Sequence, residues 1–157
     1  MFDLNSFLPY LINRTGVRVA GAFSDAIQPY GITLQMWRVL AALHHQDGQR
    51  MTELAETTSI DVSTLSRLVG SIERKGLAER QRGAGGADAR VVTVHATEAG
   101  RNLTERLIPL AQHYEAVALA GLSPEDEAAL KALLVRVYEN LEGLEPESDS
   151  DTPADAA

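Results

Sequence analysis

The chain has 157 residues, 45% of them hydrophobic, and no cysteine, which suits a single domain and excludes disulfides and thiolate chemistry. Its formal net charge is −8, but residues 142–157 hold six acids and no base, whereas residues 62–90 hold six bases and three acids, so a local basic surface is possible. No apolar run approaches the roughly 20 residues that span a bilayer, and residues 1–14 do not resemble a signal peptide, so we expect a cytoplasmic protein without a membrane partner.

Apolar residues at helical spacing predict a first helix over about residues 5–28. Pro29 and Gly31 end it, because neither residue favours continuation of a helix. Thr33 is a suitable N-cap for a second helix, which carries Trp37, the single tryptophan of the chain.

Two short helices are expected next. Thr52 is the predicted cap of the third helix, and Asp61 is the predicted cap of a fourth helix over about residues 62–75. Gly76 follows the last turn of the fourth helix, where a left-handed residue commonly ends a helix. This pair of helices predicts a helix-turn-helix.

Two extended segments, 77–82 and 91–95, flank a glycine-rich stretch and predict a β-hairpin. Thr97 then caps a fifth helix over about residues 98–120, and Ser123 caps a sixth helix that ends near residue 141. This order predicts a mainly α fold with a small β-hairpin wing, a winged helix-turn-helix. The expected parts are a helical dimerisation region at 1–30 and 98–145, a winged helix-turn-helix DNA-binding domain at 31–97, and a disordered acidic tail at 146–157.

The fourth helix combines a narrow apolar stripe with a polar face. The free N–H groups at the start of a helix suit a phosphate, hydroxyls bond phosphates or base edges, and arginine can bind guanine in a bidentate manner. A solvated helix face that contacts nothing is the alternative. The residues predicted to meet DNA from this helix are Ser63, Thr64, Ser66, Arg67 and Arg74.

Arginines also flank the predicted hairpin tip. Arg80 and Arg82 precede it, and we expect Arg80 to contact phosphates. Arg90 follows the tip, and arginine suits a narrow minor groove with a strongly negative potential. Asp88 shares a strand face with Arg90 and could orient it through a charge-assisted hydrogen bond. The alternative is a surface ion pair of little energetic value.

Three runs of sequence, 61–69, 73–78 and 88–100, resemble the recognition helix, the passage into the wing, and the wing signature of the MarR family. By that resemblance Arg90 would enter the minor groove, while the start of the fourth helix would face the major groove. The resemblance implies a homodimer that binds double-stranded DNA at a pseudo-palindromic operator. It also implies a repressor that is released by an effector.

Two apolar stripes with coiled-coil-like spacing lie on the fifth and sixth helices, and we interpret them as dimer contacts. The alternative is that both stripes pack within one chain. The stripes consist of Leu103, Leu107, Leu110, Tyr114 and Val117, and of Leu130, Leu134, Val137, Leu141 and Leu144.

The family resemblance further implies an anionic, aromatic effector, such as a small aromatic carboxylate or its coenzyme-A thioester. Arg14 and Arg18 are four residues apart, so they share one side of the first helix and could clamp an anion. Tyr10, Trp37 and His45 could complete the site. The alternatives are an ordinary core position for Trp37 and solvated or ion-paired arginines.

The chain offers no pattern of an enzyme. Its four histidines include no pair at helical i, i+4 spacing, and its serines include no Gly-x-Ser-x-Gly motif. We therefore expect neither catalysis nor a metal nor a cofactor. The alternative function is a winged-helix module that binds another protein and no DNA.

Overall fold

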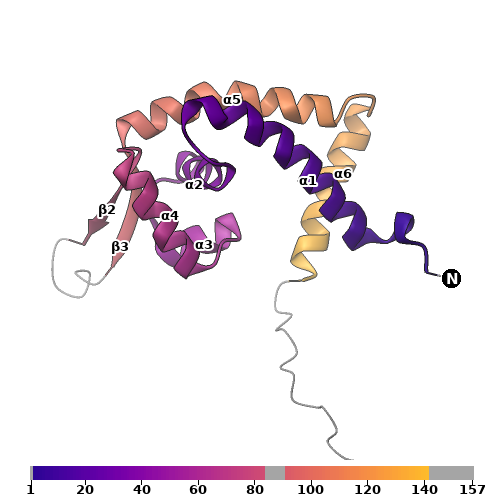
Figure 1. Cartoon of the computed structure of the whole chain (residues 1–157). Helices are drawn as coiled ribbons and strands as arrows, with labels where there is room; N and C mark the ends of the chain where they lie inside the picture. Colours follow the sequence, from indigo (N-terminus) through magenta and orange to yellow (C-terminus); the bar gives the residue numbers. More distant parts are fainter. Residues whose placement is uncertain (1, 84–90, 142–157) are drawn as a thin grey trace, which may run out of the picture. The chain divides into compact units, whose positions relative to one another are not determined.

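The computed structural model describes residues 2–83 and 91–141, and the chain forms two compact units, Met1–Ala118 and Leu119–Ala157. The first unit is mainly helical and carries a small sheet (Figure 1), as the sequence predicts. Among the described residues, no helix is both long and apolar enough to cross a membrane. The elements of the first unit are η1 (Leu4–Ser6), α1 (Leu8–Ile27), η2 (Gln28–Tyr30), α2 (Leu34–His45), β1 (Gln49–Arg50), α3 (Met51–Thr58), α4 (Val62–Arg74), β2 (Ala78–Arg82), β3 (Val92–Ala96) and α5 (Glu98–Ala118).

Two helix starts and one helix end lie where the sequence places them. Thr33 Oγ1 accepts the main-chain N–H of Met36 at 3.3 Å, and α2 begins after it. The Asp61 carboxylate accepts the N–H of Thr64 at 2.8 Å and begins α4. Gly76 follows α4 with a φ of 69°, a left-handed conformation that side chains with a Cβ rarely adopt.

The predicted Thr52 cap is wrong. Helix α3 begins at Met51, and Arg50 precedes it in an extended conformation. The Glu53 carboxylate accepts the main-chain N–H of Arg50 at 2.8 Å. Because Arg50 is also the second residue of β1, the strand runs directly into the helix, and Thr52 lies inside the first turn.

The sheet has three antiparallel strands in the order β1-β3-β2, with Gln49 opposite Val94 and Ala78 opposite Ala96. Strand β1 was not predicted, because two residues are too few to show an alternating pattern. Its Gln49 side chain is buried and donates to the carbonyl oxygen of Ala42 at 2.9 Å. This bond ties the edge strand to the end of α2.

Helices α1 to α5 and strands β2 and β3 bury one shared core. The Trp37 side chain is partly buried against this core and packs edge-to-face with the Phe23 ring, with 5.3 Å between ring centroids. The stripe on α5 also packs against this core except for Val117, which is 59% exposed. Four residues of this stripe therefore pack within the chain, as the alternative to a dimer contact predicts.

The second unit contributes one described helix, α6 (Pro124–Glu139). Ser123 Oγ accepts the N–H of Asp126 at 3.2 Å, so the predicted cap is present. Leu144 of the predicted stripe lies outside the described residues. The described part of the stripe remains largely open, with Leu130 at 40% and Leu134 at 45% exposure. Unlike the stripe on α5, it has apolar surface left for another partner.

The first turn of α5 lies against the main chain that joins α4 to β2. Thr97 Oγ1 donates to the carbonyl oxygen of Gly76 at 2.7 Å and accepts the N–H of Gly100 at 3.1 Å. A Cβ added to Gly100 would lie 1.9 Å from the carbonyl oxygen of Leu77. Glycine at this position is therefore required by the close approach of two main chains.

We expect Gly100→Ala to lower the free energy of unfolding by about 2 kcal/mol or more, because the added methyl group collides with main chain that cannot easily move. The matched control is Gly70→Ala on α4, where the nearest atom to a new Cβ is Arg74 Nη1 at 3.9 Å. Alanine there should be neutral or stabilise by up to about 1 kcal/mol through helix propensity. Urea unfolding at a fixed protein concentration measures both, and equal effects would contradict the close approach.

Candidate nucleic-acid interface

The start of α4 is organised around Asp61. Its carboxylate accepts hydrogen bonds from the Ser63 hydroxyl at 2.6 Å and from the Thr64 main-chain N–H at 2.8 Å. These bonds, with a smaller contribution from the Arg67 charge, hold the pKa of the exposed Asp61 carboxyl well below its usual range. The Ser63 hydroxyl has its only proton engaged here, so in this arrangement it can accept a hydrogen bond from a base but cannot donate one to a phosphate.

The exposed face of α4 carries the side chains that the sequence predicts. Ser66 and Arg67 are exposed, and Thr64 is half-buried. Arg74, also exposed, donates from Nη2 to Ser71 Oγ at 2.8 Å. Within the described residues the Arg67 side chain is exposed and its guanidinium makes no hydrogen bond.

Arg80, which the sequence predicts to contact phosphates, bonds residues of α4 in this structure. Its Nη1 lies 2.6 Å from Oε2 of Glu73, and its Nη2 lies 2.6 Å from the main-chain oxygen of Ser66. Arg82, two residues further along β2, is exposed. The predicted wing residues Asp88 and Arg90 lie outside the described residues.

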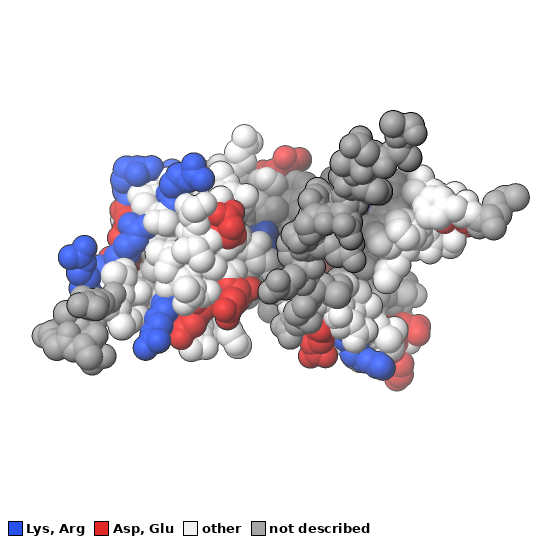
Figure 2. Space-filling view, turned by 90° about the horizontal axis from the view of Figure 1, so that it is seen from below, with Lys and Arg blue, Asp and Glu red and all other residues white. Residues whose placement is uncertain are grey.

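Basic side chains gather on the part of the first unit that carries α4 and the wing. Figure 2 shows them from below, with acidic side chains among them. The described basic residues of this segment are Arg67, Arg74, Lys75, Arg80 and Arg82. A net acidic chain thus presents a local basic surface, as the charge distribution predicts.

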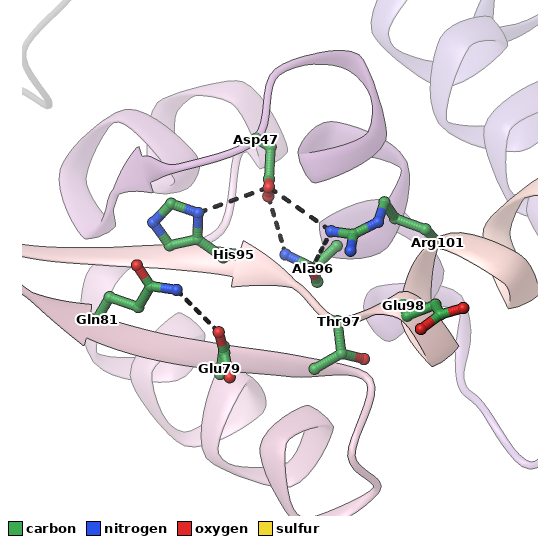
Figure 3. A pocket seen from close by; sticks show the side chains of 8 residues that line it. All are labelled: Asp47, Glu79, Gln81, His95, Ala96, Thr97, Glu98 and Arg101. Atoms are coloured by element: carbon green, nitrogen blue, oxygen red, sulfur yellow. Dashed lines mark hydrogen bonds and ion pairs between the residues drawn. The ribbon is translucent and has the colours of Figure 1, made fainter.

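A shallow, open pocket of about 340 Å³ lies beside the sheet, next to the start of α5 (Figure 3). Asp47, in the turn after α2, is its central anchor: one carboxylate oxygen accepts the N–H of Ala96 at 2.9 Å, and the other lies 3.5 Å from Nδ1 of His95 and 3.9 Å from Nη1 of Arg101. On the far strand, Gln81 donates to Glu79 at 2.8 Å. The polar groups mostly bond one another, which indicates a structural junction.

The described residues contain no group of three or more histidine, aspartate or glutamate side chains arranged to hold a metal ion. The predicted effector residues come together only in part. The Arg14 guanidinium lies 6.0 Å from the centroid of the Tyr10 ring on the same helix. Arg18 and His45 are exposed, whereas Trp37 packs against Phe23.

Helix α4 beside α3, with the β2–β3 hairpin next to it, defines a winged helix-turn-helix. Residues 30–87 match the family model described as MarR family. A crystal structure of a MarR family transcriptional regulator from Silicibacter pomeroyi DSS-3 is 31% identical, covers 90% of this chain and 100% of that chain, and has a TM-score of 0.75. The chain belongs to the MarR family of transcriptional regulators.

Two further relatives are similar over most of their length. The transcriptional activatory protein BadR of Rhodopseudomonas palustris is 28% identical over 153 residues, covering 92% of this chain and 79% of that protein. Bordetella bronchiseptica BpsR, whose DNA binding is regulated by 6-hydroxynicotinic acid, is 24% identical and has a TM-score of 0.80, with 88% of this chain and 98% of that chain covered. The likeness to BpsR shows a shared fold.

The low pKa of Asp61 predicts an acid-dependent loss of stability. Because the folded-state pKa lies below the unfolded value of about 3.9, the ionised cap stabilises the fold above that pH, and the stabilisation is lost as the pH falls toward the folded-state pKa. We therefore expect wild type to be more stable than Asp61→Asn at pH 7, with the difference shrinking below about pH 4.

Asparagine is a good N-cap without a charge, so Asp61→Asn is the matched control for Asp61→Ala, which should stay the least stable of the three at every pH. Chemical denaturation at pH 7 and pH 3 measures the free energies of unfolding. A difference between wild type and Asp61→Asn that stays constant across this range would contradict the expectation.

Proposed function

We propose that the protein is a homodimeric, sequence-specific DNA-binding regulator that acts in the cytoplasm on a pseudo-palindromic operator. The observation that carries this proposal is the exposed polar face of α4, whose opposite face is buried through Leu65, Val69 and Ile72. A helix held in this way keeps a fixed orientation while its capped N-terminal end and its arginines approach the major groove.

The contacts divide by chemistry. Arg67, with free donors, reads a base edge, and Ser63 accepts a hydrogen bond from a base. Thr64 and Ser66 lie beside them on the same surface. Arg74 and Arg82 contact phosphates, which position the protein without reading sequence. For the wing we retain the prediction that Arg90, oriented by Asp88, enters the minor groove.

The dimer is supported by apolar side chains that the first unit leaves exposed on and before α1, such as Phe2 at 71% and Val17 at 65%. The described part of α6 carries a second such set, including Leu133 at 57% and Tyr138 at 55%. Large apolar surfaces of this kind mark sites of association. A second copy of this chain is the proposed occupant, which keeps residues 1–30 and 98–145 as the dimerisation region.

Separate roles for Arg67 and Arg82 are testable on a duplex selected from random DNA. We expect Arg67→Ala to relax discrimination at one base position per half-site, with a loss of about 1–3 kcal/mol on the preferred sequence. Arg82→Ala should weaken all sequences about equally and reduce the slope of log affinity against log salt by about 1. Fluorescence anisotropy across a salt series measures both quantities.

Two results would contradict this division of roles. If Arg67→Ala changed only the salt slope, the side chain would be a phosphate contact. If the wild-type protein preferred no sequence over random duplex, the alternative of a protein-binding module would replace the proposal.

We further propose that an anionic aromatic effector, a small carboxylate or its coenzyme-A thioester, releases the operator, which makes the protein a ligand-responsive repressor. Arg14 and Arg18 would hold the anion, with Tyr10, Trp37 and His45 around it. The support is the exposed pair of arginines on α1, the partly buried indole of Trp37 in the same unit, and the effector of the relative BpsR. Release requires that the ligand prefer a conformation that binds DNA poorly.

Titration with 6-hydroxynicotinate, benzoate and benzoyl-coenzyme A tests the effector. We expect one of them to change Trp37 fluorescence and to release the selected duplex, and the double variant Arg14→Ala/Arg18→Ala to bind it about tenfold more weakly. Arg106→Ala is the matched control, because Arg106 lies 5.7 Å from the Tyr30 ring centroid and has a similar setting on α5. Unchanged affinity in the double variant would exclude Arg14 and Arg18 as the anion site. If none of the three compounds changed the fluorescence or released the duplex, this effector class would be excluded.

A further inference from the structure

Arg80 connects the first strand of the wing to two successive turns of α4. Its main-chain N–H donates to Oε1 of Glu73 at 2.8 Å, while its Nη1 donates to Oε2 of the same carboxylate at 2.6 Å. Its Nη2 donates to the main-chain oxygen of Ser66 at 2.6 Å. Ser66 and Glu73 are seven residues apart, which is about 10 Å along a helix axis. A guanidinium is much shorter than that distance, so the Glu73 side chain must extend toward Ser66 for Nη1 and Nη2 to bond both acceptors.

This arrangement leaves Arg80 poorly suited to a phosphate contact. The Glu73 carboxylate neutralises the guanidinium at close range, and both side chains are only partly exposed, at 30% and 27%. Arg82 differs, because it is exposed on the same strand and no hydrogen bond engages its side chain within the described residues. Two arginines on the same strand thus differ in their contacts: Arg80 is bonded to α4, and Arg82 is exposed.

The bonds from Arg80 to α4 add support to the wing. Among the described residues, the sheet that holds the wing has one further strand, the two-residue β1, and a two-stranded hairpin alone is marginally stable in water. An exposed ion pair adds little stability by itself, but Glu73 binds the main chain as well as the side chain of Arg80. The bonds therefore fix the direction of the strand relative to the helix.

We propose that Arg80 is a positioning residue, which with Glu73 and the Ser66 carbonyl braces the wing against the recognition helix so that both can engage DNA together. This inference rests on the proposed function and deepens it. Arg80 acts through the orientation of the wing, and its loss removes no phosphate contact.

Whether Glu73→Ala weakens or strengthens DNA binding distinguishes a bracing role of Arg80 from a phosphate contact. If Arg80 braced the wing, Glu73→Ala and Arg80→Ala would each weaken binding of the selected duplex about fivefold to tenfold, and the double variant would be no weaker than either single variant. If Arg80 bound a phosphate, Glu73→Ala would tighten binding, because it removes a negative charge beside the DNA. The matched control is Glu79→Ala, a charge removal on β2 that leaves α4 untouched and should not weaken binding.

The salt series gives the second readout. The slope of log affinity against log salt should stay at the wild-type value for Arg80→Ala and decrease by about 1 for Arg82→Ala. Lysine lacks the planar fork of arginine and can bond fewer of these acceptors, so Arg80→Lys should lose less affinity for the duplex than Arg80→Ala. This variant replaces Arg80→Ala in the test if the alanine variant folds poorly. Thermal unfolding confirms the folded state of each variant.

Amide hydrogen exchange measured by NMR tests the brace without DNA. We expect the Arg80 N–H to exchange faster in Glu73→Ala than in wild type, and no change in Glu79→Ala. A reduced salt slope for Arg80→Ala together with tighter binding by Glu73→Ala would overturn the inference, as would wild-type DNA affinity in folded variants of both residues. Absence of sequence-specific binding by the wild type would overturn the proposed function itself, while faster exchange would still identify the brace.

Discussion

The first turn of α5 approaches the main chain between α4 and β2 so closely that only glycine fits at Gly100. Thr97 bonds both sides of this contact, through the Gly76 carbonyl on one side and the Gly100 N–H on the other. The end of the recognition helix, the start of the wing and the start of the long helix α5 therefore meet at one point. The position of α4, whose exposed face is the proposed DNA-reading surface, relative to α5 depends on this contact.

The wing is held from two further directions. On one side, Arg80 and Glu73 join β2 to α4. On the other side, Asp47 joins the end of α2 to the Ala96 N–H and lies near Arg101 in the second turn of α5 (Figure 3). Each connection uses a side chain on one element and main chain on another. Because hydrogen bonds are directional, such bonds help to fix the orientation of one element relative to the other.

Much of the fold follows from local signals. The caps at Thr33, Asp61 and Ser123 bond within three residues, so their chemistry is visible in the sequence. The left-handed end of α4 is equally local at Gly76. The Thr52 cap failed because α3 begins directly after β1, a strand that forms by pairing with the distant strand β3.

The features that sequence reasoning missed depend on contacts between distant residues. Asp47 and Ala96 are 49 residues apart. In the sequence, Asp47 and Gly48 indicate only a turn, and nothing near them identifies Ala96 as the partner of the Asp47 carboxylate. Glu73 and Arg80 lie seven residues apart but on different elements, so the pairing requires knowing how β2 folds back on α4. The stripe on α5 shows the same difficulty, because periodicity identifies an apolar face without identifying its neighbour.

The central claim is that two copies of α4 read two half-sites in successive major grooves. The most direct test is sedimentation equilibrium of the protein with a duplex selected for tight binding, combined with footprinting of the half-sites on the same duplex. We expect two chains per duplex and half-site centres about one helical turn, or roughly 34 Å, apart. One chain bound with full affinity to a single isolated half-site would contradict it.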